Sequence, residues 1–381
     1  MLSPRISGNT FRSGKTKRSR LLVQACFALF AFLYLYVMQG EYVSWSLSAL
    51  TSGQSHHAPL LYALIGSILC GLLQCGTSRL LPGLPDQAYA LTALPSAVIL
   101  VLLTAYPDYS AALIASVAAL MAGGVVAKLA LRHGRKHMSA VNICTWNTLI
   151  LFALFLFVGL AGNTHDVLHY ELRTARLLVD NKPAEAARVG SKSLATSPQL
   201  TALRALALSK EGKLPENLFR YALSPGGCRN LLLTPTDAAR LGLPQASPGA
   251  LMNCPAFWGG NARQYFDGPV RRAAMRPDRT AQDYRLCALL LDKDIDRFAS
   301  ELRNYYELDS LATPLPTAYR EALILYRQLR TRPLYLYDDN AVQANFNDFE
   351  TIRRAPGNRI ENENRARREY GHTYWWYYFY G

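Results

Sequence analysis

Long apolar segments alternate with short polar ones over the first 162 residues. Five of them follow one another, at residues 21–38, 59–76, 88–105, 110–131 and 143–162. At about 1.5 Å per helical residue, segments of about 18 to 22 residues can cross a hydrocarbon layer of roughly 30 Å. The pattern therefore predicts a bundle of five membrane-spanning helices in residues 21–162, with a kink in the third helix at Pro95.

The basic residues between these segments predict an orientation. Residues 1–20 contain six Lys and Arg and no acidic residue, and Arg132, Arg135 and Lys136 follow the fourth segment. The loops 39–58 and 106–109 contain no Lys or Arg. Because cytoplasmic loops carry the excess of positive charge, we expect residues 1–20 in the cytoplasm and residues 163–381 outside it.

Residues 163–381 have the composition of a water-soluble helical domain. Amphipathic stretches joined by tight polar turns predict helices at residues 166–178, 183–194 and 199–210. Their spacing partly matches a tetratricopeptide repeat (TPR), at Tyr170, Leu177, Ala186 and Pro198, and departs from it at Gly190. The expected fold class is therefore all-α, a five-span bundle followed by a TPR-like domain.

The remainder of this domain alternates irregular and helical sequence. Residues 224–268 are rich in Gly and Pro, and we expect an irregular segment there. Helices are predicted at residues 280–291, 294–306 and 317–329, the first of them with a capping box formed by Thr280 and Asp283.

Residues 374–380 are seven consecutive aromatic residues. Three interpretations remain open: packing within the same domain, docking at the membrane interface, where Trp and Tyr concentrate, or a site for a partner or a glycan. The candidate interaction residues are Tyr374, Trp375, Trp376 and Tyr377.

Net charge adds little to this picture. Up to residue 162 there are 11 Lys and Arg against 3 Asp and Glu, and after it 30 against 24, within totals of 41 and 27. Most of the excess thus belongs to the orientation signal, and we expect the lipid bilayer rather than nucleic acid as the partner.

The seven cysteines form no metal-binding pattern. Four lie in apolar segments, where cysteine behaves as a small buried hydrophobe. Of the three in the outer domain, Cys228 and Cys254 lie in loop-like sequence and are the candidate pair for a disulfide bond, whereas Cys287 lies in a helical run.

Two patterns resemble metal sites. His165 and His169, four residues apart, would share one helix face as zinc ligands do, although no third ligand follows. The run at residues 292–296, DKDID, imitates the start of a calcium loop, but Arg297 and Arg303 replace its required Gly and Glu. We therefore expect no metal or cofactor, and acidic residues that cap the helix at residues 294–306.

Four segments resemble one family. They are YLYVMQG at residues 34–40, YRLCALLLDKDIDRF at 284–298, PTAYREALILY at 316–326 and YGHTYWWYY at 370–378. They are similar to uncharacterised multi-span envelope proteins of Bacteroidota with a domain of unknown function. The resemblance implies an inner-membrane location with the helical domain in the periplasm, and it supplies no catalytic residue.

Two functions fit these observations. The first is a non-enzymatic inner-membrane protein whose periplasmic domain binds another envelope protein. The second is an enzyme acting on lipid-linked glycans, by analogy of architecture, with Glu41, His165 and His169 as its candidate polar residues. The sequence leaves the oligomeric state open.

Overall fold

The computed structural model describes residues 8–51, 57–132, 139–243, 248–308 and 315–381, with side chains from residue 17. Within these ranges the chain is helical and contains no strand. It divides into two compact units, Met1–His165 and Asp166–Gly381. The basic residues of loop 133–138 and of residues 1–7, on which the expected orientation partly depends, lie outside the described residues.

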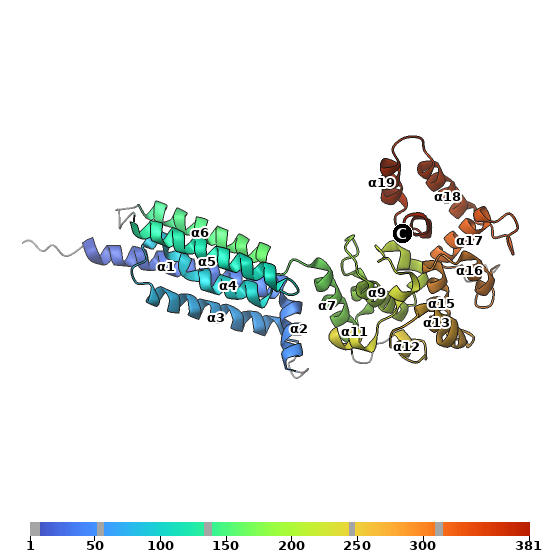
Figure 1. The fold of residues 1–381 in the computed structure, drawn as a ribbon, viewed down its shortest axis with the longest axis horizontal. Helices are drawn as coiled ribbons and strands as arrows, with labels where there is room; N and C mark the ends of the chain where they lie inside the picture. The colour runs from blue at the N-terminus through green and yellow to red at the C-terminus, as the bar shows by residue number, and fades with distance from the viewer. Residues whose placement is uncertain (1–7, 52–56, 133–138, 244–247, 309–314) are drawn as a thin grey trace, which may run out of the picture. The chain divides into compact units, whose positions relative to one another are not determined.

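The first unit is a bundle of apolar helices (Figure 1). Its elements are α1 (Gly8–Leu33) with a π-helical end (Tyr34–Met38), α2 (Gly40–Leu50), α3 (Pro59–Leu80), the 3-10 helix η2 (Asp86–Ala93), α4 (Leu94–Leu103), α5 (Tyr109–Arg132) and α6 (Ala140–Ala161). Five candidate membrane spans are long and apolar enough to cross a bilayer: Lys17–Met38, Pro59–Leu80, Asp86–Leu103, Tyr109–Arg132 and Ala140–Ala161. The five predicted apolar helices are thus confirmed.

The third candidate span forms the centre of this bundle. Of the residues in Asp86–Leu103, 61% are buried, whereas 11 to 28% are buried in the most apolar 18 residues of each of the other four spans. It changes from a 3-10 helix to an α-helix at Leu94, and Pro95 lies in the first turn of α4. A proline is tolerated there because the first N–H groups of a helix have no partner within the helix.

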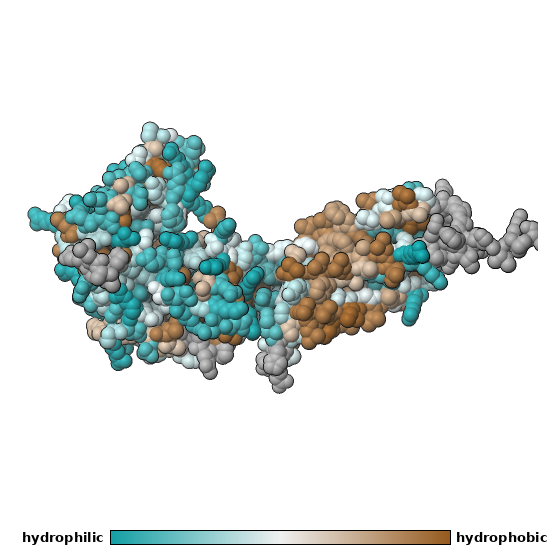
Figure 2. Space-filling model, turned by 180° about the vertical axis from the view of Figure 1, so that it is seen from behind, coloured by the Kyte–Doolittle hydropathy of each residue, from teal (hydrophilic) through white to brown (hydrophobic). Residues whose placement is uncertain are grey.

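The other helices present apolar side chains to the outside. Ile114 and Met121 on α5 are 71% and 65% exposed, and Leu160 on α6 is 76% exposed. Figure 2 shows such side chains gathered over the first unit, whereas the surface of the second unit is mostly hydrophilic. An apolar exterior of this kind suits a lipid environment.

One buried amide joins α6 to the start of the central span. Asn147 on α6 accepts a hydrogen bond from the backbone N–H of Ala90 at 2.8 Å. Its amide nitrogen donates to the carbonyl oxygens of Asp86 at 2.7 Å and Ile143 at 2.9 Å. The side chain therefore satisfies backbone groups that the 3-10 helix leaves unpaired.

The second unit consists of short helices. Its first part contains α7 (Asp166–Val179), α8 (Pro183–Arg188), α9 (Pro198–Lys210), α10 (Leu214–Asn217), η3 (Leu218–Arg220), η4 (Gly227–Leu231), α11 (Pro235–Arg240) and α12 (Pro248–Leu251). Its second part contains α13 (Ala262–Tyr265), η5 (Phe266–Val270), α14 (Arg271–Ala274), α15 (Arg279–Leu291), α16 (Ile295–Leu302), α17 (Thr317–Leu329), α18 (Asn340–Arg353), α19 (Arg359–Tyr370) and α20 (Tyr374–Tyr380).

Helix α8 ends earlier than the sequence predicts. It ends at Arg188 rather than at residue 194, and Gly190 follows with φ +59°. A Cβ atom at Gly190 would lie 2.8 Å from the ring of Tyr170. Because only glycine combines this left-handed conformation with so close an approach, Gly190 takes the place of the large apolar residue of the repeat pattern.

The predicted capping box of α15 is wrong. Asp278 caps the helix and accepts hydrogen bonds from the backbone N–H groups of Thr280 and Ala281. Asp283 is buried and accepts hydrogen bonds from the hydroxyl groups of Tyr306 at 2.5 Å and Tyr319 at 3.0 Å. Burial raises the pKa of this carboxyl, while the two hydroxyl groups and Arg279 act in the opposite direction.

Candidate ionic binding site

The two histidines whose spacing resembles a zinc site do not share a helix face. Helix α7 begins at Asp166, so that only His169 is helical. His165 lies before the helix, with its Nε2 atom 2.8 Å from a carboxylate oxygen of Asp108. No group of three His, Cys, Asp or Glu side chains placed to hold a metal ion occurs within the described ranges.

Cys228 and Cys254 are free thiols in the structure and do not form the candidate disulfide bond. Burial, with a smaller effect of Asp292, raises the pKa of the Cys228 thiol to about 12. The Cys254 sulfur lies 3.4 Å from the carbonyl oxygen of Met252 and 3.5 Å from that of Pro269, and either oxygen can accept its S–H. Each cysteine therefore has its own polar surroundings.

The aromatic tail forms helix α20, which packs on its own domain. Tyr374, Trp375 and Tyr377 are 0%, 1% and 9% exposed. The indole nitrogen of Trp375 donates to the carbonyl oxygen of Glu321 at 2.8 Å, and its ring lies 5.2 Å from that of Phe346. Of the four candidate interaction residues, only Trp376 is partly exposed.

A cluster of charged side chains surrounds a cavity of about 280 Å³, here called the ionic cavity. Its lining combines three arginines and three aspartates with four less polar residues: Arg263, Arg285, Arg297, Asp267, Asp292, Asp294, Cys228, Phe266, Ala288 and Leu289. An adjoining hollow of about 440 Å³ shares Cys228, Arg263 and Asp292 with it.

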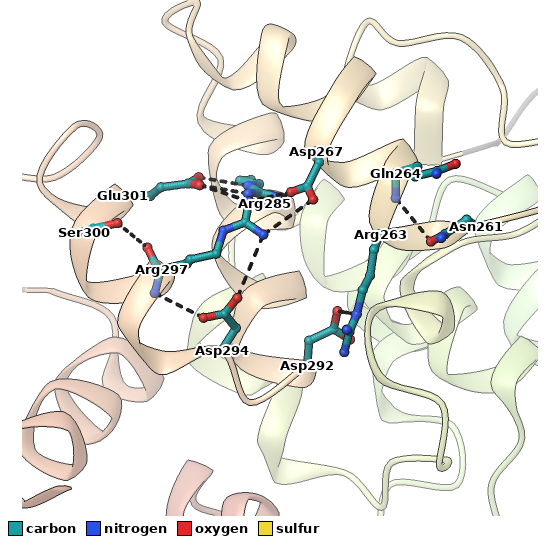
Figure 3. A network of polar contacts seen from close by, with 10 residues as sticks. All are labelled: Asn261, Arg263, Gln264, Asp267, Arg285, Asp292, Asp294, Arg297, Ser300 and Glu301. Carbon is teal, nitrogen blue, oxygen red and sulfur yellow. Dashed lines mark hydrogen bonds and ion pairs between the residues drawn. The ribbon is translucent and has the colours of Figure 1, made fainter.

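Arg285 is the centre of the network in Figure 3. Its side chain is 1% exposed, and two of its nitrogen atoms each lie 2.8 Å from a carboxylate oxygen of Glu301. Its third nitrogen lies 2.8 Å from Asp267. Burial alone would lower the pKa of Arg285, but the hydrogen bonds with Glu301 and Asp267 outweigh it and raise the pKa.

Arg297 is the second, half-exposed cation of this network. It lies 2.6 Å from Asp267 and 3.8 Å from Glu301. Burial would raise the pKa of Asp267, but the hydrogen bonds from Arg297 and Arg285 lower it. Asp267 therefore stays ionised between two guanidinium groups, which hold it by charge-assisted hydrogen bonds.

Asp292 forms the other wall of the cavity. One of its oxygens accepts a hydrogen bond from the backbone N–H of Cys228, and the other from Arg263, both at 2.8 Å. The backbone at Gly227 passes so close that a side chain there would strike this carboxylate. Arg263 itself is 71% exposed and reaches out at the rim.

The three aspartates of the run DKDID have separate roles. Asp292 fixes the loop at Cys228, Asp294 caps α16 through the backbone N–H of Arg297, and Asp296 pairs with Arg330 at 2.6 Å. Capping by the acidic residues is thus confirmed for Asp294. The ionic cavity itself was not predicted, because its arginines are far apart in the sequence and form no motif.

Comparison with known proteins gives one partial match. DUF6057, described as a family of unknown function, matches residues 273–381. The match covers α15 to α20, with Arg285, Arg297 and Glu301, and leaves out Arg263 and Asp267. The expected likeness to a domain of unknown function is therefore confirmed for this part of the chain. No match was found among curated proteins or among solved structures.

Proposed function

We propose that the chain is an inner-membrane protein that presents its second unit in the periplasm, where this unit binds another envelope protein and performs no catalysis. The five candidate spans support the membrane location. The distribution of Lys and Arg between the apolar segments supports a cytoplasmic N-terminus and a periplasmic second unit. The packing of α7, α8 and α9 against one another supports a TPR-like start of this unit.

The ionic cavity is the observation that carries the binding function. Its buried charges are paired with one another, whereas Arg263, Arg297 and Asp267 remain 42 to 71% exposed at its edge. Alternating exposed charges of both signs recognise a partner of complementary charge and set its orientation, and arginine is enriched at the energetic centres of interfaces.

Charge reversal at the rim tests this proposal. The full-length protein is purified from native membranes in mild detergent, and the proteins that accompany it are identified by mass spectrometry. We expect a stoichiometric envelope protein to accompany the wild type, and Arg263→Glu to lose it. The control is Arg332→Glu, at an exposed site away from the cavity lining, which should keep the partner. Equal recovery with all three forms would refute a role for the cavity.

The expected topology has its own measurement. Reporters active only outside the cytoplasm, fused at Gly381, should be active, whereas the same reporters fused after Arg132 should be inactive. Activity in the reverse pattern would place the second unit in the cytoplasm.

An enzyme acting on lipid-linked glycans is the alternative, which two contacts in the first unit favour. His57 lies 3.7 Å from Glu41, and His165 lies 2.8 Å from Asp108. The rings of Tyr42 and Tyr106, 6.4 Å apart, bring these two carboxylate–histidine pairs to one end of the bundle. Such pairs can transfer protons to and from a substrate.

This alternative predicts that Glu41→Ala, and separately His165→Ala combined with His169→Ala, abolish turnover of lipid-linked glycan in membranes. A protein that purifies alone or with bound lipid-linked glycan, and that loses turnover in these variants, would replace the binding proposal. Full turnover in both variants would exclude the alternative.

A further inference from the structure

A second cavity of the second unit, here called the Glu321 cleft, has a different character. Its volume is about 410 Å³, within the range of sites that hold small ligands. Residues from α10, η3, α17 and α18 line it, together with the end of α19, the turn that follows and the start of α20. All but three of the lining residues belong to the segment that matches DUF6057.

Glu321 forms the buried wall of this cleft. The residue is 7% exposed, and its Oε2 atom accepts a hydrogen bond from the backbone N–H of Tyr374 at 2.7 Å. Burial raises the pKa of Glu321 to about 7, against the smaller opposing effects of the Tyr374 N–H, Arg220 and Arg320. The carboxyl thus adds less negative charge to the cleft than an exposed glutamate would.

Two guanidinium groups at the cleft have N–H groups without a hydrogen-bond partner among the described residues. Arg220 is exposed and has no hydrogen bond or ion pair with another described residue. Arg320 uses its two terminal nitrogens for Asp339, at 3.2 Å, and Thr317. Each of these nitrogens has a second N–H group, and 31% of the side chain is exposed, so that Arg320 can donate to a ligand as well.

Two further side chains of the cleft can accept or donate hydrogen bonds. The carboxylate of Glu216 and the side-chain amide of Asn345 line the cavity, and neither side-chain group has a hydrogen bond with a described residue. Phe219 and Trp375 supply apolar walls between the polar groups. A ligand that matches this lining has a carboxylate for the arginines, N–H and C=O groups for Glu216 and Asn345, and a small apolar side chain.

We propose that the Glu321 cleft binds the carboxylate of a short peptide segment, with Arg220 and Arg320 holding the carboxylate by charge-assisted hydrogen bonds. The proposal rests on the binding function proposed above and names the chemistry of the segment that the partner contributes. Peptides have the required combination of a carboxylate, amide groups and side chains, whereas an inorganic anion would leave Glu216 and Asn345 without partners.

A peptide selection on the full-length protein in detergent tests this inference. The probes are a random octapeptide pool with free C-terminal carboxylates and the same pool with amidated ends. We expect peptides to be enriched from the first pool. If the carboxylate is that of the C-terminus, the amidated pool yields none. If it is that of Asp or Glu within the peptide, the amidated pool yields peptides rich in these residues.

Point variants assign the enriched peptide to the cleft. Arg220→Ala lies on the exposed edge, where loss of folding is not expected, and should weaken binding of the best peptide about 30-fold or more. Arg332→Ala, another exposed arginine, should leave it unchanged. Equal weakening by both variants, or no enrichment from either pool, would overturn the inference.

The outcome for the Glu321 cleft can be distinguished from the outcome for the proposed binding of an envelope protein. If Arg220→Ala still captures the envelope protein that the wild type captures, and no peptide is enriched, the cleft proposal fails and the proposed function stands. If peptides are enriched and lost in Arg220→Ala, the cleft proposal stands even where the ionic cavity proves irrelevant.

Discussion

The backbone N–H of Tyr374 lies 2.7 Å from a carboxylate oxygen of Glu321, so the start of α20 is fixed to the middle of α17. The backbone carbonyl of the same glutamate accepts a hydrogen bond from the indole of Trp375. One residue of α17 thus holds two consecutive residues of the tail. Since this carboxyl is buried, its ionisation and the docking of the tail are linked.

The first prediction concerns pH. Burial raises the pKa of Glu321 to about 7, whereas its ordinary value is 4.5. When folding raises the pKa of a carboxyl, its stabilising contribution is complete at a pH below the pKa of the unfolded state. This contribution is lost as the pH rises through the pKa of the folded state. We expect Glu321→Gln, which keeps an acceptor for Tyr374, to exceed the stability of the wild type by about 1 kcal/mol or less at pH 5 and by on the order of 3 kcal/mol at pH 8.5.

The measurement is denaturant unfolding of the full-length protein, followed by tryptophan fluorescence at both pH values. Glu307→Gln, at an exposed site, is the control and should show no such difference. If the free energy of unfolding of Glu321→Gln differed from that of the wild type by the same amount at pH 5 and at pH 8.5, the linkage would be contradicted.

The second prediction separates two neighbouring tryptophans. Trp375 is 1% exposed and packs between α17 and α18, so Trp375→Ala should lower the free energy of unfolding by about 3–5 kcal/mol. Trp376 is partly exposed and stacks on Tyr380 at 4.5 Å, so Trp376→Ala should lower it by only about 1 kcal/mol. Labelling of the buried Cys287 thiol at increasing urea concentrations measures the free energy of unfolding of both variants. Similar losses for the two variants would mean that the tail is not packed as described.

The third prediction concerns the ionic cavity. Arg285→Leu leaves the buried Glu301 without its bidentate partner, and we expect a loss of stability of about 3–5 kcal/mol. Adding Glu301→Leu removes the buried carboxylate that has lost its bidentate partner and should restore part of this loss. Arg263→Leu breaks the ion pair with Asp292, in which the arginine side chain is 71% exposed. This variant should change stability by about 1 kcal/mol or less. If the double variant were less stable than Arg285→Leu, the loss of the bidentate partner of Glu301 would not be the cause.

The fourth prediction concerns two glycines with left-handed backbone. Gly190 and Gly212 have φ of +59° and +65°, but only at Gly190 would a Cβ atom meet another group, the ring of Tyr170. Both alanine variants have the backbone cost of about 1–2 kcal/mol. Gly190→Ala should lose about 1–3 kcal/mol more than Gly212→Ala, because the Tyr170 ring must move. Thermal unfolding of the two variants measures this difference. Equal losses of stability would show that the Tyr170 ring moves without a measurable cost.

The elements that sequence reasoning predicts best are those set by composition alone. Five long apolar segments give five apolar helices, because burial in lipid requires little more than length and the absence of charge. Helix α17 was predicted with its observed bounds, Thr317–Leu329, since Pro316 and a periodic apolar face define it locally. The seven aromatic residues left three interpretations open, and the burial of Tyr374, Trp375 and Tyr377 favours packing within the domain.

The rest depends on contacts between residues that are distant in the sequence. Asp283 fits a local capping pattern, yet its partners Tyr306 and Tyr319 lie 23 and 36 residues away. Helix α19 is too polar to show an apolar face, and only Ala366 of its residues is buried. Arg285 and Asp267 form their ion pair across two elements, and Arg220 joins the Glu321 cleft from a third. No spacing rule connects such residues before the chain is folded.

The amide of Asn147 has a consequence for the biogenesis of the protein. The 3-10 helix that it serves begins the third apolar segment, and its backbone groups at Asp86 and Ala90 obtain their partner from the fifth. A ribosome makes the fifth segment more than fifty residues after this point. These groups of the third segment therefore obtain the Asn147 amide as a partner only after the last helix of the bundle has been made.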